Sequence, residues 1–203
     1  MSPAARFVRL HSPAVVLDLA DVDTDQIVPA RFLKRPREEG FGQYLFHSLR
    51  RNPDGSLRED FPLNAPTVAG AQLLVAGANF GCGSSRENAV YALLDAGFRA
   101  VIAPSFGDIF SGNSLKNGLL PVVLPAEVIE RLRARVRAAP ATEITVDLER
   151  LCVECEGLTQ AFEIDPFARE ALLSGVEEIG LTLQLAEAIR HFEETDALRR
   201  PWL

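Results

Sequence analysis

The sequence predicts an α/β fold, in which strands and helices alternate along the chain. Between residues 73 and 138, short apolar runs alternate with amphipathic segments of helical length, and this alternation is typical of a sheet with helices on its faces. Hydrophobic residues make up 47% of the 203 residues and charged residues 24%, which is an ordinary globular composition. The chain is therefore long and apolar enough to build a core.

The first part of the chain contains one predicted strand, at 14–20, with the sequence AVVLDLA. The acidic run DVDTDQ follows it and is predicted to form a loop, because Asp and Thr side chains readily hydrogen-bond to nearby backbone groups. Segment 34–62 is rich in Arg, Glu, Gly, Asn and Pro, and its NPDGS stretch favours a turn. We expect 34–62 to be a mobile excursion that interrupts the core rather than building it.

The central part is predicted to contain three strands and three helices. The strands are expected at 73–77, 100–104 and 119–124, and the helices at 85–96, 108–117 and 126–138. In the first of these helices, apolar residues recur at one-turn spacing and form one face: Ala89, Ala92, Leu93 and Ala96. Gly97 lies where this helix is expected to end.

The last part of the chain returns to β structure and then becomes helical. Residues 144–164 alternate between apolar and polar side chains, which favours a β-hairpin. Two helices are predicted after it, near 166–174 and 182–195. We expect a single domain spanning 1–203, with residues 166–203 as its helical C-terminal part.

Charge and cysteine content exclude several classes of protein. The chain has 21 basic and 28 acidic residues, a net charge of −7, which is the wrong sign for a protein that neutralises nucleic-acid phosphates. Three cysteines do not make a secreted disulfide framework, and no apolar run approaches the length that spans a bilayer. We expect a cytoplasmic protein that binds neither nucleic acid nor a membrane.

The stretch NFGCGSSRENAVYAL, residues 79–93, places small polar residues where a strand passes into a helix. Gly81, Gly83, Ser84 and Ser85 would occupy the turn, where unpaired helix N–H groups and the helix dipole favour an anion. Arg86 is unfavourable for helix stability at that end, so it is a candidate for contacting the anion, and a bidentate clamp on a carboxylate is its natural use.

Familiar motifs fail at this turn, and a structural reading stays open. Dinucleotide and hydrolase motifs would need glycine at position 86, and the lysine of a P-loop is absent. In the structural reading, Ser84 or Ser85 only caps the helix and Arg86 is solvated.

Four segments together resemble one family over essentially the whole chain: VDTDQIVPARFL at 22–33, NFGCGSSRE at 79–87, IAPSFGDIFSGNSLKNGLLPV at 102–122 and IGLTLQ at 179–184. Their order and spacing resemble the small subunits of 3-isopropylmalate dehydratase, within the aconitase family. The resemblance implies a swivelling β/β/α domain that closes over a large subunit in a hetero-oligomer. It also implies that the large subunit, and not this chain, carries a four-iron four-sulfur cluster, so that this chain holds no metal.

The resemblance also implies site residues and a reaction. Ser84 would be the general base, while the Ser85 backbone and the Arg86 side chain would hold a carboxylate of a small dicarboxylate substrate. The reaction would isomerise 2-isopropylmalate to 3-isopropylmalate through 2-isopropylmaleate, in leucine biosynthesis. Such a hydro-lyase needs a base on one side of the substrate and a Lewis acid on the other. A serine becomes basic enough only where its alkoxide is stabilised, as helix N–H groups and Arg86 would do.

Two further regions are candidate parts of the site. In DVDTDQIVP, Thr24 and Asp25 are expected to orient groups across the cleft, although a loop held by Asp side chains without a catalytic role is an open alternative. The next stretch, ARFLKRPREEGFG, resembles the loop that sets substrate choice, and its candidates are Arg31, Phe32, Leu33 and Lys34. Phe32 and Leu33 would contact an apolar substrate side chain, and Lys34 or Arg35 a carboxylate.

The sequence departs from the family pattern beside the serines. The family usually continues SSRE with His and often has Pro and Trp shortly after, whereas this chain has Asn88, Val90 and Tyr91. Losing the His removes a titratable group. Two alternatives therefore stay open: a paralogue acting on a related 2-alkylmalate or a citraconate-like acid, and a non-catalytic subunit that binds anions and regulates.

The cysteines and histidines are predicted to be structural. Cys152 and Cys155 lie three apart in a predicted strand, so their side chains point to opposite faces, and a lone C-x-x-C is a weak match to a metal site. A redox or metal protein built on these two residues and Cys82 is a third alternative, which predicts bound iron or zinc on the chain alone. His11, His47 and His191 stand far apart and are expected to be surface or packing residues.

Overall fold

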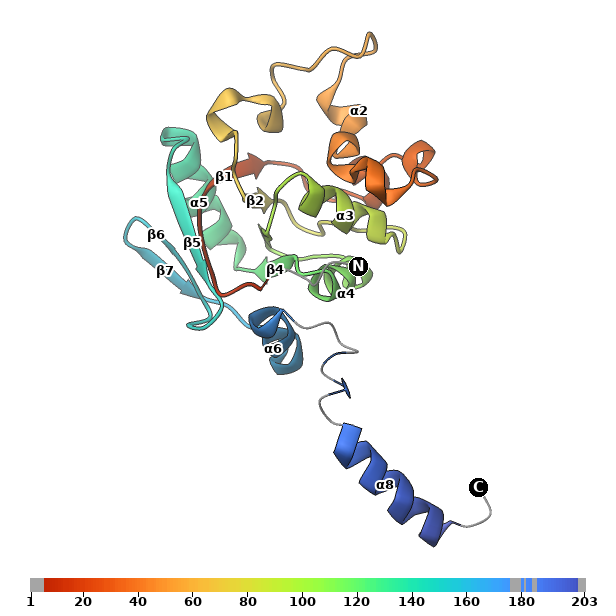
Figure 1. Ribbon diagram of the computed structural model, residues 1–203. Coiled ribbons are helices and arrows are strands. Elements are labelled where there is room, and N and C mark those ends of the chain that lie inside the picture. The colour runs from red at the N-terminus through yellow and green to blue at the C-terminus, as the bar shows by residue number, and fades with distance from the viewer. Residues whose placement is uncertain (1–5, 176–179, 181, 184–185, 201–203) are drawn as a thin grey trace.

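The computed structural model describes residues 6–175, 180, 182–183 and 186–200. Its centre is a seven-stranded sheet with the order β4-β3-β2-β1-β5-β6-β7, packed between helices (Figure 1). The strands are β1 (Arg9–Leu17), β2 (Leu73–Ala76), β3 (Ala100–Ala103), β4 (Leu120–Val123), β5 (Glu143–Asp147), β6 (Cys152–Cys155) and β7 (Leu158–Ala161). The α/β prediction is confirmed.

The first four strands form a parallel half-sheet. β1 pairs with β2, β2 with β3 and β3 with β4, all in parallel. Every residue of β2 and β3 is buried, as expected for parallel strands that are covered on both faces. The carboxyl ends of these strands therefore point to one edge of the sheet, where the loops that follow them lie together.

The remaining strands form an antiparallel half-sheet, and β1 belongs to both halves. Its first part, from Arg9 to Pro13, pairs antiparallel with β5, and its last part, from Ala14 to Leu17, pairs parallel with β2. The predicted strand at 14–20 thus begins earlier and ends at Leu17. β5, β6 and β7 then form a three-stranded meander in place of the predicted single hairpin.

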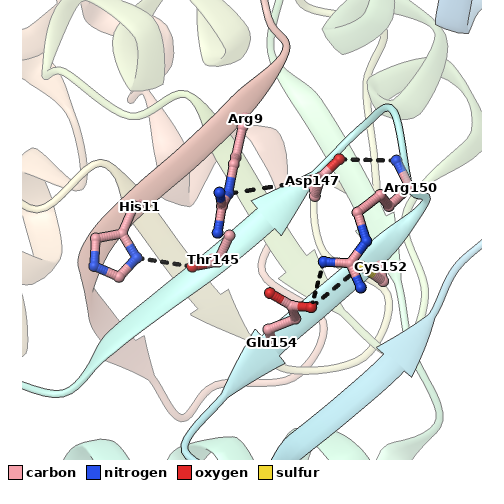
Figure 2. Close-up of polar contacts among 7 residues, drawn as sticks. All are labelled: Arg9, His11, Thr145, Asp147, Arg150, Cys152 and Glu154. Carbon is pink, nitrogen blue, oxygen red and sulfur yellow. Dashed lines mark hydrogen bonds and ion pairs between the residues drawn. The ribbon is translucent and has the colours of Figure 1, made fainter.

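One face of the antiparallel half is polar. Figure 2 shows side chains of β1, β5 and β6 on this face, among them His11, Thr145 and Glu154. Cys152 shares it, because it lies opposite Asp147 in the ladder, whereas Cys155 packs in the apolar cluster on the other face. The prediction that the two cysteines point to opposite faces is confirmed.

Helices cover the two faces of the sheet with separate apolar clusters. The first core cluster contains buried residues of α3 (Glu87–Asp95), and the second contains those of α5 (Ala126–Ala138) and α6 (Pro166–Ser174). α4 (Asp108–Lys116) gives Phe110 to the first cluster and packs Leu115 against the second.

The helix predicted at 85–96 is shorter in the structure, because Arg86 has an extended backbone and α3 begins only at Glu87. Ala96 lies just past the end of α3 and is exposed, so it does not belong to the buried face as predicted. The buried face of α3 contains Val90 instead, beside the predicted Ala89, Ala92 and Leu93. Gly97 has a φ of +99°, the left-handed conformation that commonly ends a helix and that glycine adopts without strain.

Segment 34–62 contributes to the core, and the expectation that it only interrupts the core is wrong. It folds into short helices at Arg37–Glu39, Phe41–Tyr44 and His47–Arg50, the last being α2. Its buried members belong to the first core cluster: Phe41, Tyr44, Leu45, Phe46 and Phe61. Its mobility stays a prediction.

The C-terminal part is helical where the structure describes it. α6 covers the predicted helix at 166–174 and begins at Asp165, whose side chain accepts a hydrogen bond from the Ala168 N–H at 2.9 Å. α8 (Ala186–Arg199) continues the helix predicted at 182–195. Of the IGLTLQ segment, residues 179, 181 and 184 lie outside the described residues. Over the described ranges, no helix is long and apolar enough to cross a membrane.

Candidate active site

Three loops lie side by side at the carboxyl ends of β1, β2 and β3. Backbone hydrogen bonds join the first two loops, from the Gly81 N–H to the Val22 carbonyl at 2.7 Å and from the Thr24 N–H to the Cys82 carbonyl at 3.0 Å. The Phe80 N–H donates to the Ser105 carbonyl of the third loop at 3.1 Å. The backbone pairing of β1, β2 and β3 thus continues into the loops that follow them, and the loop 77–86 lies between the other two loops.

Two glycines give this middle loop its shape. Gly81 has a φ of +75°, and a Cβ there would lie 2.2 Å from Cγ of the Phe110 ring. Gly83 has a φ of +91°. Only glycine adopts these backbone conformations without strain. The turn that the two glycines make leads the chain into Ser84 and the start of α3.

Ser84, Ser85 and Arg86 form the end of this loop. Both serines are exposed. Arg86 is the N-cap residue of α3, and within the part of the chain that the structure describes no side chain caps this helix. The reading in which a serine caps α3 and Arg86 is solvated is therefore wrong. The first N–H groups of the helix and its positive dipole end are directed at the loop.

Thr24 and Asp25 belong to α1 (Thr24–Ile27) and contact this loop from the neighbouring one. The buried Thr24 hydroxyl donates a hydrogen bond to the Ser84 carbonyl at 3.1 Å. The Asp25 carboxylate forms an ion pair with the Arg86 guanidinium. Four of the predicted site residues, Thr24, Asp25, Ser84 and Arg86, are thus brought together.

A different residue holds the α1 loop itself. Asp23 caps α1: its carboxylate accepts from the Gln26 N–H at 2.7 Å, and the Gln26 side chain accepts from the Asp23 N–H at 2.9 Å. The local turn predicted for this acidic run therefore depends on Asp23. This leaves the carboxylate of Asp25 to contact Arg86.

Cys82 lies between these loops and is partly exposed. Burial, and then the carboxylates of Asp23 and Asp21, raise the pKa of its thiol, so it is less ionised than an ordinary cysteine. Cys152 and Cys155 lie on β6. Among the described residues, no group of three His, Cys, Asp or Glu side chains is placed to hold a metal ion.

The four residues of the candidate specificity loop lie at or just after the short helix Ala30–Phe32. The Phe32 ring stacks on Tyr44 with 4.3 Å between ring centroids, and Leu33 packs against the first core cluster. Arg31 bonds to His47 at 3.0 Å, while Lys34 is exposed. Across the described chain, their side chains make no hydrogen bond or ion pair with Ser84 or Arg86.

Sequence reasoning missed the polar contacts that flank the serine loop. The Asn79 amide donates to Asp21 at 2.8 Å, and on α3 the Tyr91 hydroxyl donates to Glu87 at 3.0 Å. Asn88, which directly follows SSRE, is half-buried. Asp21 directly follows the predicted strand at 14–20, and Asn79 comes two residues after the end of the one at 73–77. Their places just after these two strands were the available signal.

His11 lies away from this site, on the polar face of the antiparallel half (Figure 2). Its ring nitrogens contact the Thr145 hydroxyl at 2.7 Å and the Glu143 carboxylate at 2.6 Å, beside a surface cavity of about 540 Å³. These contacts join β1 to β5. His11 is thus a packing residue of the sheet, as predicted.

Family models match most of the chain. Residues 4–127 match the aconitase C-terminal domain, and residues 178–203 match the C-terminal domain of the 3-isopropylmalate dehydratase small subunit. A third model, described as LeuD_N, matches residues 130–166. The first match contains all of the candidate site.

Individual proteins are similar over nearly the full length. The 3-isopropylmalate dehydratase small subunit of Paracoccus denitrificans is 47% identical over 98% of this chain and 99% of its own. The corresponding proteins of Rubrobacter xylanophilus and a Parafrankia species are 50% and 52% identical, over 92% and 94% of this chain and 93% of their own.

A solved structure shares the fold. The crystal structure of 3-isopropylmalate dehydratase from Methanocaldococcus jannaschii superposes with a TM-score of 0.65 at 27% identity, covering 90% of this chain and 99% of that one. The expected swivelling β/β/α type is thereby confirmed.

Proposed function

The chain belongs to the family of 3-isopropylmalate dehydratase small subunits, and from this premise we propose that it serves a hydro-lyase that isomerises 2-isopropylmalate to 3-isopropylmalate through 2-isopropylmaleate. In this proposal the chain acts in leucine biosynthesis, as one subunit of a hetero-oligomer with a large subunit that carries a four-iron four-sulfur cluster. Its relatives' names support the reaction. The observation that carries the proposal is the exposed Ser84 beside an Arg86 that is already held in place at the N-terminus of α3.

Ser84 is the proposed general base. Its hydroxyl is exposed on a loop fixed by the Thr24 hydrogen bond to its own carbonyl, so the side chain is presented while the backbone is held. An alkoxide at this place would be stabilised by the positive end of α3 and by the Arg86 guanidinium. Ser84 can then take a proton from the substrate carbon next to a carboxylate.

Arg86 is the proposed carboxylate clamp, together with the Ser85 N–H. A guanidinium holds a carboxylate through two parallel hydrogen bonds. Asp25 already pairs with Arg86, which lowers the conformational freedom that the guanidinium would lose when substrate binds. Asp25 thus acts as the orienting residue and Arg86 as the binding one.

The reaction has two halves, dehydration and rehydration, and Ser84 takes up a proton in the first and returns it in the second. In dehydration Ser84 removes the proton from the methylene carbon of 2-isopropylmalate, and hydroxide leaves the carbon that bears the isopropyl group. In rehydration of 2-isopropylmaleate, the proton returns to the isopropyl-bearing carbon and hydroxide adds to the other one. The cluster of the large subunit would supply the Lewis acid that assists departure and addition of hydroxide.

The residues on and after the short helix Ala30–Phe32 are the proposed determinants of substrate choice. Phe32 and Leu33 offer apolar surface for the isopropyl group, and Lys34 or Arg35 offers positive charge for a carboxylate. Phe32 is held by Tyr44 and His47, whose ring centroids lie 4.3 and 4.8 Å away. This stacking keeps the Phe32 ring in one position.

The test of the proposed base is Ser84→Ala, with Ser85→Ala as its matched control. Each variant is reconstituted with the large subunit, and hydration of 2-isopropylmaleate is followed anaerobically. We expect Ser84→Ala to lower kcat by about 10²–10⁴-fold, the usual contribution of a general base. Ser85→Ala keeps most of its activity, because Ser85 acts through its backbone. Full activity of Ser84→Ala would show that another group removes the proton.

One observation favours a related substrate as the second candidate function. Asn88 stands next to the site where the family usually has His, and it cannot titrate near neutral pH. If the chain serves a paralogue, kcat/KM will be higher for a shorter alkylmaleate or for citraconate than for 2-isopropylmaleate. Asn88→His would then shift the preference toward 2-isopropylmaleate.

A further inference from the structure

Two non-glycine residues with left-handed backbones meet at the rim of the candidate site. Asp21, in the loop after β1, has a φ of +52°, and Asn79, in the loop after β2, has a φ of +56°. Asp and Asn adopt this conformation more easily than other residues with side chains. Strain of this kind persists only where surrounding contacts hold it, and it gathers at functional sites.

The Asn79 side chain and backbone connect all three loops of the site. Its amide Nδ2 donates a hydrogen bond to Oδ1 of Asp21 at 2.8 Å. Its backbone N–H donates to the hydroxyl of Ser105, in the loop after β3, at 2.8 Å. All three residues are exposed. Their polar contacts therefore join the loops to one another, and their side chains do not fill the core.

The two loops joined by Asp21 and Asn79 carry the two halves of the site. Thr24 and Asp25 follow Asp21, while Ser84 and Arg86 follow Asn79, and the halves meet again where Thr24 bonds the Ser84 carbonyl and Asp25 pairs with Arg86. Each loop is thus fastened to the other at both ends. A change at the Asp21 end would tilt one loop against the other and displace Asp25, which pairs with the Arg86 guanidinium, relative to Ser84.

We propose that Asn79, with Asp21 and Ser105, is a positioning residue for the reaction at Ser84, an inference that rests on the proposed function. These residues do not contact substrate. They hold the loop that carries Ser84 against the loop whose Asp25 orients the Arg86 guanidinium. A small misplacement of a reacting group is enough to slow a reaction by orders of magnitude.

The experiment exchanges the donor and acceptor of the Asp21–Asn79 hydrogen bond. Asn79→Asp sets two carboxylates against each other. The double variant Asn79→Asp, Asp21→Asn restores the bond, because the amide at position 21 then donates to the carboxylate at position 79. Asn79→Gly keeps the left-handed backbone without the side chain. Asn52→Asp is the matched control, since Asn52 bonds Ser56 in a distant surface turn.

We expect a kcat effect with rescue. In the reconstituted complex, Asn79→Gly and Asn79→Asp lower kcat for 2-isopropylmaleate hydration by about tenfold or more. The double variant recovers to within about threefold of the parent, since the exchanged bond couples the two positions. Asn52→Asp keeps the parent rate. Hydrogen exchange of residues 78–88 is faster in Asn79→Asp and returns to the parent rate in the double variant.

The proposal is overturned if Asn79→Gly turns over at the full rate, or if the double variant is as slow as Asn79→Asp while equally folded. Unchanged hydrogen exchange in Asn79→Asp overturns it as well, and this readout does not depend on turnover. Failure of the proposed function would look different, because Ser84→Ala in the same assay would then be fully active.

Discussion

At the scale of single residues, Gly81 is a position with no room for a side chain. A Cβ there would lie 2.2 Å from the Phe110 ring, and the φ of +75° already disfavours a side chain. We predict that Gly81→Ala lowers the free energy of unfolding by about 2–4 kcal/mol, because a clash inside a packed cluster adds to the backbone strain. Denaturant unfolding of the isolated chain measures this.

Gly112 supplies the matched control for that substitution. It lies inside α4, and a Cβ there meets nothing within 4 Å. Gly112→Ala should raise the free energy of unfolding by about 0.5–1 kcal/mol, through helix propensity alone. Equal destabilisation by the two substitutions would show that the Phe110 contact does not govern the loop.

Cys82 gives a pH-dependent prediction. Only the thiolate is alkylated, and because burial, Asp23 and Asp21 raise the pKa of this thiol, Cys82 should react with iodoacetamide more slowly than free cysteine at pH 8. The rate should rise as the pH passes above the ordinary thiol pKa. Mass spectrometry of the native chain measures the rate, and labelling in denaturant is the control. Rapid labelling at pH 7 would contradict the assigned environment.

The candidate site shows what sequence can and cannot predict for single residues. The place of Ser84 and Arg86 between a strand and a helix predicts an anion-binding turn, whereas the role of Ser84 as base is implied by the family resemblance. The ion pair of Arg86 with Asp25 joins positions 61 residues apart, and no local pattern predicts such a pairing. Asn79 and Asp21 were missed for the same reason.

At the scale of elements, the Asp95 carboxylate at the end of α3 binds two residues of segment 34–62. Asp95, the last residue of α3, accepts a hydrogen bond from the Phe41 N–H at 2.8 Å, and Arg37 approaches it at 3.5 Å. The Arg37 guanidinium also lies over the Tyr91 ring, 3.5 Å from its centroid. We call Arg37, Phe41, Tyr91 and Asp95 the α3 latch.

Removing the carboxylate should open the α3 latch. We predict that Asp95→Ala speeds tryptic cleavage after Arg37 by roughly tenfold, because a lost hydrogen bond to a charged group lowers the opening free energy by about 1.5 kcal/mol. Cleavage is followed by mass spectrometry under native conditions.

Asp60→Ala is the control for this measurement. Asp60 pairs only two residues away with Arg58, on the exposed part of the same segment. Its loss should leave cleavage after Arg37 unchanged. If both variants were cleaved at the parent rate, the latch would contribute nothing to the order of 34–62.

The composition of segment 34–62 explains why its short helices were not predicted. Its average composition is polar and rich in glycine and proline, and the four aromatic residues that enter the core stand apart from one another: Phe41, Tyr44, Phe46 and Phe61. Periodicity is the signal for an element, and short irregular helices carry none. The strands at 73–77 and 100–104 were predicted because their sequences are apolar throughout, and every residue of β2 and β3 is indeed buried.

At the scale of the whole molecule, the α/β class followed from alternation alone, but the strand order did not. The sequence gives no sign that β1 pairs with both β2 and β5, because pairing between distant segments depends on faces that form only on folding. The early start of β1, at Arg9, was missed because its first half, RLHSP, mixes polar residues and a proline and lacks a regular apolar pattern.

The double pairing of β1 sets the order in which the protein can be completed during synthesis. β1 is synthesised before the other six strands of the sheet, yet its partner β5 follows about 130 positions later, which at ordinary elongation speeds is a delay on the order of ten seconds. For that time the Arg9–Pro13 edge lacks its β5 neighbour and is open to pairing with another chain. β1, the first of the seven strands to be synthesised, is thus among the last to gain both of its neighbours.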